Sequence, residues 1–221
     1  MLKTRNDTKE YTGKRLLDVA VSAFMLLLFA PFMLVIAVCI KLEDGGDIFY
    51  RQKRVTMDGK IFEILKFRSM IQDAEKQGFK PCTTHDDRIT RVGRIIRATR
   101  LDETPQLINI LKGDMSIVGP RPERVEHVEK YTSQLPEFSY RLRVRGGLTG
   151  YAQIYGKYNT SAYDKLRLDL MYIENYSFML DIKLIILTLR IIFSKESTEG
   201  IDKQFEAQQK IEELLKGLDE E

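Results

Sequence analysis

The feature that most constrains this chain is an apolar segment, residues 19–40, with the sequence VAVSAFMLLLFAPFMLVIAVCI. It contains 22 residues and no charge. As a helix it would be roughly 33 Å long, enough to cross a hydrocarbon core of about 30 Å. It is too long for a cleaved signal peptide, and the KLEDGG that follows offers no small-residue cleavage site. A buried core helix is the alternative, but the length of the uncharged segment favours the membrane.

Pro31 lies near the middle of this segment. Proline removes a backbone donor and clashes with the preceding turn, so we expect the helix to kink there. Basic residues flank both ends, with Lys14 and Arg15 before the segment and Lys41 and Arg51 after it. The positive-inside rule therefore assigns neither end to the outside. The residues allow both a re-entrant helix that returns to the same membrane face and a straight span.

The composition limits the kinds of site that the rest of the chain can form. With 221 residues the chain is long enough for one compact domain and a membrane element. The net charge of +3 argues neither for nor against nucleic acid. Two cysteines form no disulfide framework and indicate a reducing compartment, and two histidines make a zinc site improbable. We expect any metal to be a hard cation such as Mg²⁺, held by carboxylates and substrate phosphates.

The part that follows the apolar segment has the pattern of a mixed α+β domain. Residues 48–55 and 60–70 are rich in β-branched and aromatic residues and flank TMDG, so we predict a β-hairpin. Helices are expected at 71–77 and 89–99. A further helix, ETPQLINILK, is expected with Asp102 as its N-cap, Pro105 in its first turn and Gly113 as its C-cap.

The second half continues with short elements. MSIVG predicts a strand, RPERVEHVEKYT a helix with Pro122 in its first turn, and RGGLTGYAQIYG a glycine-rich loop. Residues 161–177 predict an amphipathic helix, and residues 205–221 an exposed terminal helix. The residues expected on one stripe of the amphipathic helix are Tyr163, Leu166, Leu170 and Ile173.

Residues 181–193, DIKLIILTLRIIF, are strongly apolar but too short to span a membrane. Lys183 and Arg190 would let this helix lie in the headgroup plane with its basic side chains reaching water. A core helix with two charges at its surface fits the sequence equally well.

Arginine recurs at every third position from 88 to 100. On a helix this spacing drifts by about 60° per step, so the five side chains do not form one stripe. Some can face carboxylates while others face lipid headgroups, and a solvated basic helix is the alternative. A nucleic-acid surface is disfavoured because aromatic residues are not interleaved and the chain carries the apolar segment.

Asp102 and Glu103 are adjacent carboxylates at the expected start of a helix, where the macrodipole favours negative charge. We therefore expect Asp102 to be ionised at neutral pH. It could cap the helix, bind a metal, or attack phosphorus as a nucleophile. Capping is the commonest of these roles for an isolated pair. Cations in or beside tight turns, as a phosphate site requires, favour the chemical roles here. These cations are Lys66, Arg68, Arg121 and Arg145.

Taken together, these motifs resemble the bacterial sugar transferase family, the monotopic polyprenyl-phosphate phosphoglycosyltransferases. The resemblance is carried in order by KRLLDV, the apolar segment with its central proline, KFRSM, LDETPQLINILKGDMSIVGPRPE, GLTGYAQI and LRLDLMYIENYSFMLDIKLIILT. It extends from about residue 14 to residue 193, and the chain is similar to the short form that contains only the catalytic core.

The resemblance implies an α+β fold with an N-terminal re-entrant membrane helix in residues 1–41. It implies a mainly helical catalytic domain on the cytoplasmic side in residues 42–193, with a small β-hairpin and interfacial amphipathic helices. Residues 194–221 form a charged C-terminal tail. The implied activity is transfer of a sugar 1-phosphate from a UDP-sugar to undecaprenyl phosphate, with release of UMP, at the cytoplasmic face of the bacterial inner membrane.

The resemblance also implies residue roles. Asp102 is expected to be the nucleophile that forms a covalent aspartyl-phosphosugar, and Glu103 its partner in binding Mg²⁺. Arg97 corresponds to an arginine near the lipid phosphate, and PRPE (residues 120–123) is expected to contact the nucleotide sugar. The expected substrate-binding residues are Lys66, Arg68, Arg97, Pro120, Arg121, Glu123, Arg145 and Asp169.

The expected partners are the UDP-sugar donor, the polyprenyl phosphate acceptor and the lipid bilayer, without nucleic acid. A homodimer is compatible with the sequence but is not indicated by any motif. The alternative function is a membrane-surface scaffold whose basic helix binds anionic lipid, which would require neither Asp102 nor Mg²⁺.

Overall fold

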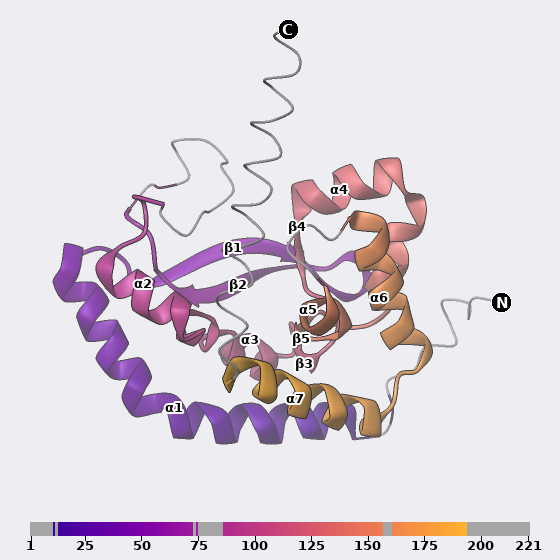
Figure 1. Ribbon diagram of the computed structural model, residues 1–221, viewed down its shortest axis with the longest axis horizontal. Coiled ribbons are helices and arrows are strands. Elements are labelled where there is room, and N and C mark those ends of the chain that lie inside the picture. Colours follow the sequence, from indigo (N-terminus) through magenta and orange to yellow (C-terminus); the bar gives the residue numbers. More distant parts are fainter. Residues whose placement is uncertain (1–10, 12, 73, 75–85, 157–160, 194–221) are drawn as a thin grey trace, which may run out of the picture.

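The computed structural model describes residues 11, 13–72, 74, 86–156 and 161–193. It has an α+β fold that is mostly helical, with a long helix along the lower edge of Figure 1 and two small sheets above it. The helices are α1 (Lys14–Asp44), α2 (Arg91–Ala98), α3 (Gln106–Lys112), α4 (Val125–Gln134), α5 (Tyr151–Tyr155), α6 (Ala162–Glu174) and α7 (Phe178–Phe193). The strands are β1 (Phe49–Val55), β2 (Ile61–Phe67), β3 (Ser116–Val118), β4 (Glu123–Arg124) and β5 (Gly147–Thr149). Shorter 3₁₀ segments are Met57–Gly59, Leu101–Glu103 and Pro136–Arg143.

Helix α1 contains the whole apolar segment and includes Pro31 in its interior. In Figure 1 it runs straight along the lower edge for its first half and then turns upward, as expected for a helix with an internal proline. By length and composition it could cross a membrane, and only 11% of its most apolar part is buried inside the protein. A core helix of a soluble protein would be mostly buried, so the packing of α1 supports the membrane interpretation over that alternative.

Both ends of α1 contact the body of the protein. At the N-terminal end, the buried Lys14 ammonium donates to Asp181 Oδ2 of α7 at 2.5 Å. The next residue, Arg15, donates to the last carbonyls of α3, those of Ile110 and Leu111, at 2.5 Å each. The basic pair at the start of the apolar segment therefore fixes α1 to two other helices, in addition to any role in setting membrane orientation.

The C-terminal end of α1 is held in a similar way. Asp44 pairs with Arg68, which follows β2. Glu43 accepts backbone hydrogen bonds from Arg91 N at 2.7 Å and Val92 N at 3.3 Å, and so caps the start of α2. Both ends of the long apolar helix are thus attached to elements of the same folded body.

The predicted hairpin is confirmed: β1 and β2 are antiparallel and joined through the expected Asp58-Gly59 turn, where both residues have positive φ. Strand β4 adds to the other edge of β1, which gives the order β2-β1-β4. A separate parallel pair joins β3 to β5. Here a Cβ atom on Gly147 would lie 2.0 Å from the backbone nitrogen of Gly119, so only glycine allows this close approach.

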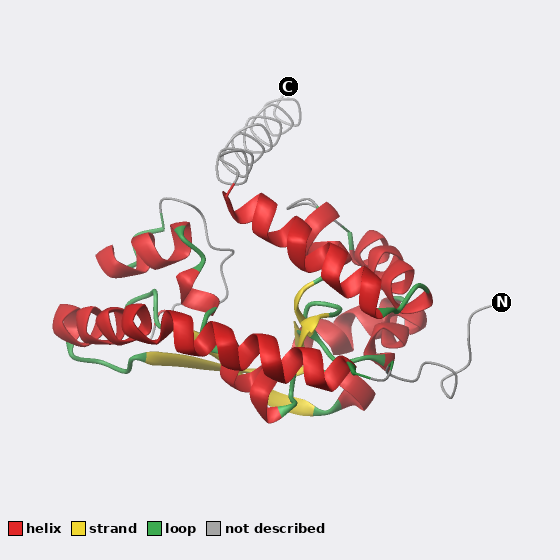
Figure 2. Ribbon diagram, turned by 90° about the horizontal axis from the view of Figure 1, so that it is seen from below, coloured by secondary structure: helices red, strands yellow, loops and turns green. Residues whose placement is uncertain are grey.

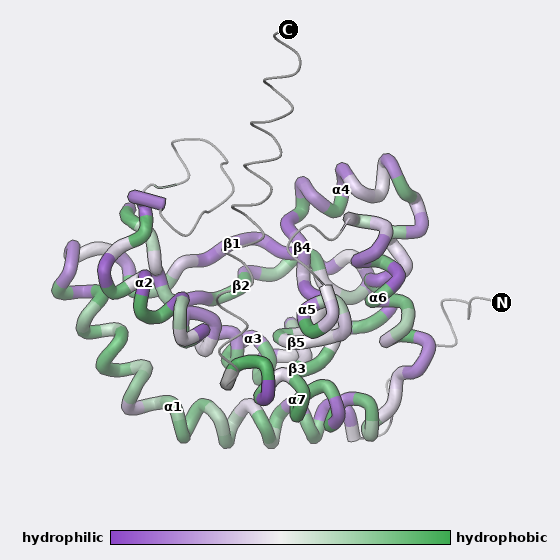
Figure 3. The backbone as a smooth tube through the Cα atoms, in the orientation of Figure 1, coloured by the Kyte–Doolittle hydropathy of each residue, from purple (hydrophilic) through white to green (hydrophobic). Residues whose placement is uncertain are grey.

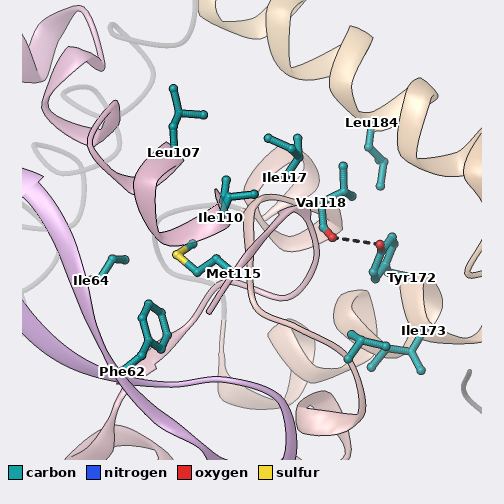
Figure 4. Packing of buried hydrophobic residues seen from close by; sticks show 11 residues of the cluster. Phe62, Ile64, Leu107, Ile110, Met115, Ile117, Val118, Tyr172, Ile173 and Leu184 are labelled. Atoms are coloured by element: carbon teal, nitrogen blue, oxygen red, sulfur yellow. Dashed lines mark hydrogen bonds between the residues drawn. The ribbon is translucent and has the colours of Figure 1, made fainter. Parts of the chain in front are cut away.

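The main hydrophobic core lies between β2, β3 and helices α3, α6 and α7 (Figure 4). Its central residues include Ile110 and Met115, which are fully buried, and Tyr172, whose hydroxyl donates to the carbonyl of Val118 at 3.0 Å. A second cluster connects the C-terminal half of α1 with β2 and α2. Its buried members are Ile36, Ile40, Phe67 and Ile96. Burying each such aliphatic or aromatic side chain contributes about 1.5–3 kcal/mol, so this cluster adds packing to the polar contacts of α1.

Helices α1 and α7 lie on the same side of the molecule. Both lie toward the lower edge in Figure 1, and in the view from below α1 crosses in front of the long strands (Figure 2). Both helices are mainly hydrophobic along their length (Figure 3). Leu184 of α7 is buried, whereas Met179, Ile186 and Leu189 are exposed, so α7 covers the core with one face and leaves an apolar face outside. The core-helix interpretation of residues 181–193 therefore describes one face of α7, and the membrane-surface interpretation describes the other.

Several local predictions differ from the structure. Asp102 is not the N-cap of α3: it lies in the preceding 3₁₀ turn, and Pro105 occupies the N-cap position. Pro122 precedes β4 rather than beginning a helix, because the chain first pairs with β1. Tyr163 is 59% exposed and is not part of the buried stripe of α6. The expected loop over 145–156 contains β5 and α5. Most of residues 71–77 and all of 205–221 lie outside the described residues.

Candidate active site

The adjacent carboxylates Asp102 and Glu103 lie in a 3₁₀ turn between α2 and α3. The chain enters this turn through Arg100, whose φ of 60° is uncommon for a residue other than glycine. Helix α2 is held closely against the segment after β2, since a Cβ atom on Gly93 would lie 2.0 Å from the carbonyl oxygen of Ser69. The turn is therefore positioned beside β2 by the packing of the helix that precedes it.

Glu103 is bound by two cations. Its Oε1 atom accepts from Lys66 Nζ of β2 and from an Nη atom of Arg121, at 2.6 Å each. Burial alone would raise the pKa of Glu103, but the Arg121 and Lys66 charges outweigh burial and hold the pKa well below its ordinary value. Glu103 is consequently ionised and fixed in orientation.

Asp102 has a different environment. It is half-buried, and no donor lies within hydrogen-bonding distance of its carboxylate among the residues that the structure describes. Burial raises the pKa of Asp102, while the charges of Lys66, Arg97 and Arg100 oppose that shift. The expectation that a helix N-terminus stabilises its charge was wrong, because Asp102 does not cap α3. Burial and the charge of Glu103 outweigh the nearby cations, so the pKa of Asp102 stays above its ordinary value although those cations favour the ionised form.

Asn109 fixes the strand that carries Lys66, and sequence reasoning did not identify it. This buried side chain on α3 donates to the carbonyl of Glu63 at 2.8 Å and accepts from Leu65 N at 3.0 Å. Its amide thus pairs with the backbone of β2 as a neighbouring strand would. Since α3 directly follows the carboxylates, this pairing sets the distance between Lys66 and Glu103. The sequence feature that could have identified Asn109 is a polar residue placed among the apolar residues of this helix.

Arg141 was also missed, and it connects two of the predicted site residues. It lies in the 3₁₀ segment Pro136–Arg143 and is almost fully buried. Its Nε atom donates to Asp169 Oδ2 of α6 at 2.8 Å, and its Nη2 atom donates to the carbonyl of Arg121 at 2.7 Å. Asp169 therefore contacts the site through Arg141, which orients the backbone of Arg121, and not through the carboxylates themselves.

Glu123 of β4 lies next to this group. Lys165 of α6 donates to its Oε1 atom at 2.7 Å. Although burial favours the neutral acid, the charges of Lys165 and Arg141 lower the pKa of Glu123 to about 2. Opposite charges thus follow one another from Lys66 of β2 to Lys165 of α6, and the two charged residues of the PRPE segment, Arg121 and Glu123, belong to this series.

The remaining predicted residues occupy different positions. Arg68 is buried and pairs with Asp44 at the end of α1, away from the carboxylate pair. Arg97 is half-buried near the end of α2, where its charge acts on Asp102. Pro120 is buried, with its carbonyl accepting from Gly147 N at 2.9 Å. Arg145 is half-buried at the turn before β5.

The site offers few ligands to a metal ion. Within the described ranges, no group of three or more His, Cys, Asp or Glu side chains could hold one. Mg²⁺ is commonly bound by one or two carboxylates together with substrate phosphates and water. Asp102 and Glu103 fit this pattern, because Lys66 and Arg121 both donate to Oε1 of Glu103 and leave its other oxygen without a hydrogen bond in the described part of the chain. They suit an ion that arrives with a phosphorylated substrate.

Comparison with known proteins identifies a family and several relatives. The profile of a family described as bacterial sugar transferase matches residues 9–195. The chain is 42% identical over 184 residues to a UDP-N-acetylgalactosamine-undecaprenyl-phosphate N-acetylgalactosaminephosphotransferase of Aeromonas hydrophila, covering 82% of this chain and 44% of that protein. It is 40% identical over 189 residues to a UDP-glucose:undecaprenyl-phosphate glucose-1-phosphate transferase of Caulobacter vibrioides, covering 83% and 71%. The uncharacterized sugar transferase EpsL of Bacillus subtilis is 37% identical over 186 residues, covering 84% and 90%. The match thus spans under half of the first relative and most of the other two.

Proposed function

Because this chain belongs to the bacterial sugar transferase family, we propose that it transfers a sugar 1-phosphate from a UDP-sugar to undecaprenyl phosphate and releases UMP. The names of two similar proteins describe this reaction class with different sugars, N-acetylgalactosamine in one and glucose in the other. The proposal therefore specifies a UDP-sugar as donor and does not select the sugar. The product would enter a bacterial glycan pathway such as exopolysaccharide or lipopolysaccharide synthesis.

The observation that carries this proposal is the unequal environment of the two adjacent carboxylates. Glu103 is fixed by Lys66 and Arg121, whereas Asp102 is half-buried among cations without a hydrogen-bonded partner in the described part of the chain. A carboxylate in this situation is available as a nucleophile, and the surrounding cations can offset the charge of a phosphate. In the proposed first step, an Asp102 oxygen attacks the phosphorus that carries the sugar. A new P–O bond forms, the P–O bond to UMP breaks, and UMP leaves with the bonding electrons.

In the second step, an oxygen of the lipid phosphate attacks the same phosphorus. The bond to Asp102 breaks, and the carboxylate is regenerated. This order supports a covalent route because UMP can leave before the second anionic substrate approaches. The charge of Arg97 acts on Asp102, and its neighbour Ile96 on α2 packs against the apolar C-terminal half of α1. This position near both the carboxylate and the membrane helix supports a role of Arg97 in binding the lipid phosphate.

Asp102 and Glu103 would also hold Mg²⁺ together with the donor phosphates. When bound, this ion would offset the negative charge of the diphosphate and act as a Lewis acid on the phosphate oxygens. Lys66 and Arg121 keep Glu103 ionised in the absence of the ion, so the carboxylate is prepared to accept it. Residues 120–123 would contact the nucleotide, with Arg141 and Lys165 holding that segment in place.

For α1 we propose a re-entrant topology, in which the helix bends and returns to the cytoplasmic face of the inner membrane. The supporting observation is that Lys14 at one end and Asp44 at the other both contact the same folded body. In a straight span the two ends would lie on opposite sides of a hydrocarbon core about 30 Å thick. Helix α7 lies on the same side of the molecule as α1 (Figures 1 and 2) and carries exposed apolar side chains, which supports its contact with the lipid surface.

The reaction can be tested directly. Detergent-solubilised protein is incubated with a panel of UDP-sugars and polyprenyl phosphate, and UMP, UDP and lipid-linked sugar are quantified. We expect equal amounts of UMP and lipid-linked sugar phosphate with at least one donor. Release of UDP would indicate transfer of the sugar alone and contradict the proposal. A scaffold that only binds anionic lipid would release neither nucleotide.

A further inference from the structure

Two arginines face each other across neighbouring strands beside the candidate active site. In the antiparallel pairing of β1 with β4, Arg54 is the direct partner of Arg124. Directly opposed residues project from the same face of a sheet, and like charges in this arrangement are destabilising. The pairing therefore brings positive charge together at the edge of the sheet that leads into the PRPE segment.

Among the residues that the structure describes, the guanidinium of Arg54 donates only to neutral acceptors. Its Nη1 atom donates to the carbonyl of Pro122 at 3.1 Å, and its Nη2 atom donates to Gln52 Oε1 at 2.6 Å. Its Nε atom is buried and has no hydrogen-bond partner among the described residues. Within the same part of the chain, no carboxylate lies at ion-pair distance from this guanidinium. An arginine that is largely enclosed and lacks a counter-ion is an unusual arrangement.

The surroundings of Arg54 do not neutralise it. Burial and then the charge of Arg121 lower the pKa of Arg54, and Arg124 acts in the same direction. The carboxylate with the largest opposing influence is Glu123, which is already bound by Lys165 at 2.7 Å. Among the described residues Arg54 thus has no carboxylate of its own, as expected where an anionic ligand completes the site.

Arg121 connects this position to the candidate nucleophile. One of its Nη atoms binds Glu103 at 2.6 Å, and its charge acts on both Arg54 and Asp102. In a UDP-sugar the second phosphate is joined to the reacting phosphate by a single bridging oxygen. With the reacting phosphate at Asp102, the second phosphate would therefore come within reach of Arg121, whose charge also acts on Arg54.

We infer that Arg54 binds the phosphate of the UMP portion of the donor, together with Arg121. This inference rests on the proposed function, which supplies the diphosphate donor. The phosphate gains negative charge as the bond to the reacting phosphorus breaks, and a guanidinium placed to accept that charge favours departure of UMP. Arg54 would then contribute both to donor binding and to the first chemical step.

Binding of UMP and of uridine separates this role from a structural one. The two ligands differ by the phosphate alone, so the ratio of their affinities measures recognition of the phosphate. Both are titrated into the detergent-solubilised full chain by calorimetry, in the wild type and in Arg54→Gln. We expect the wild type to bind UMP more tightly than uridine, and this ratio to fall about tenfold or more in Arg54→Gln. Arg54→Lys, which keeps the charge but loses the forked donors, should give an intermediate ratio.

Arg51→Gln is the matched control, because Arg51 lies on the same strand with a 65% exposed side chain and a surface ion pair to Glu63 at 3.9 Å. Its ratio should equal that of the wild type. Two results in Arg54→Gln would overturn the inference. Equal loss of UMP and uridine affinity would show that Arg54 only supports the Pro122 carbonyl, and wild-type affinity for both ligands would show that it has no role in binding.

If the wild type transfers sugar phosphate while Arg54→Gln keeps the full ratio of UMP to uridine affinity, the inference alone is contradicted. A wild type that neither binds UMP nor releases it from any UDP-sugar contradicts the proposed function as well.

Discussion

The Lys66 ammonium of β2 donates to the Glu103 carboxylate at 2.6 Å, and this contact distinguishes two neighbouring acids. Arg121 donates to the same oxygen of Glu103, whereas the Asp102 carboxylate has no hydrogen-bonded partner in the described part of the chain. The family resemblance assigns the two carboxylates different roles, but the sequence alone gives no physical difference between their environments. The structure makes one of them a fixed anion and leaves the other available, which is the division that the proposed mechanism uses.

The first prediction concerns the metal. Glu103 already has two cationic partners, so a metal ion is not needed to stabilise the free protein. Treatment with EDTA should abolish UMP release, and added Mg²⁺ should restore it, while the midpoint of thermal unfolding without substrate changes little. Full turnover after exhaustive chelation would exclude the metal role of Asp102 and Glu103. A large fall in the unfolding midpoint would instead indicate a resident structural ion.

The second prediction concerns the buried Arg141–Asp169 pair, whose side chains are 2% and 1% exposed. Asp169→Asn leaves a buried guanidinium without its counter-ion, which should lower the free energy of unfolding by roughly 3 kcal/mol. It should also reduce turnover, because Arg141 orients the Arg121 backbone. Chemical denaturation and UMP release measure the two effects.

Asp164→Asn is the control on the same helix, since Asp164 is exposed and pairs with Arg167 at the surface, at 4.0 Å. The hydroxyl of the N-cap residue Ser161 donates to Asp164 Oδ2 at 2.7 Å, and it can donate equally to the amide oxygen of Asn. It should change stability by less than about 1 kcal/mol. Similar losses in the two variants would show that the buried pair has no special role. Normal activity in a folded Asp169→Asn variant would exclude a role of Asp169 in positioning the site.

The sequence predicts the elements whose signals are local. The Asp58-Gly59 turn gives the hairpin, and Gly113 ends α3 in the left-handed conformation as expected. It does not predict the parallel pairing of β3 with β5. That pairing depends on a close backbone approach between Gly119 and Gly147, which are distant in the sequence, so no local pattern indicates it.

The candidate site was predicted to a similar extent. Charged residues within motifs, such as Lys66 and Arg121, were identified and do meet at Glu103. Asn109 and Arg141 were missed because their partners are backbone atoms and a carboxylate distant in the sequence. The motif resemblance included Arg68, but the fold uses it to hold the end of α1. Chemical type alone does not distinguish a ligand-binding cation from a structural one.

The third prediction concerns acid stability through Glu123. Its pKa is about 2 in the folded protein, against 4.5 as the ordinary value, so the folded state binds this proton less readily than the unfolded state. The resulting stabilisation is present above pH 4.5 and is lost as the pH falls toward 2. At 1.36 kcal/mol per pKa unit it amounts to roughly 3 kcal/mol.

Glu123→Gln does not titrate at this position, so it should be less stable than the wild type at pH 7 and should approach wild-type stability near pH 2. Thermal unfolding followed by circular dichroism across this range measures the difference. Glu63→Gln removes an exposed carboxylate of β2 and should change stability by less than about 0.5 kcal/mol throughout. A difference for Glu123→Gln that is independent of pH would exclude the ion-pair explanation.

The fourth prediction concerns topology. The N-terminus and the catalytic body should share the cytoplasmic side, because both ends of α1 contact that body. A single cysteine introduced at position 5, in a chain whose Cys39 and Cys82 are replaced by serine, should react with a membrane-impermeant reagent only after the inner membrane is opened. A second cysteine at Lys53, on exposed β1, serves as the reference.

Pro31→Leu should straighten α1 and shift part of the population to a full span, with position 5 then labelled from the periplasm. Val38→Leu, at an exposed position of the same helix, should leave the labelling unchanged. Periplasmic labelling of position 5 in the wild type would refute the re-entrant topology.

The central claim is that Asp102 forms a covalent bond to the sugar phosphate, and mass measurement of the intact protein tests it most directly. Incubation with UDP-sugar in the absence of polyprenyl phosphate should release about one equivalent of UMP and raise the protein mass by one sugar phosphate, which peptide mapping places on Asp102. Asp102→Asn should show neither change while retaining the wild-type unfolding midpoint, because the Asp102 side chain makes no hydrogen bond in the described structure. Substantial transfer by Asp102→Asn, or release of UMP only when the lipid acceptor is present, would contradict the account and favour direct attack by the lipid phosphate.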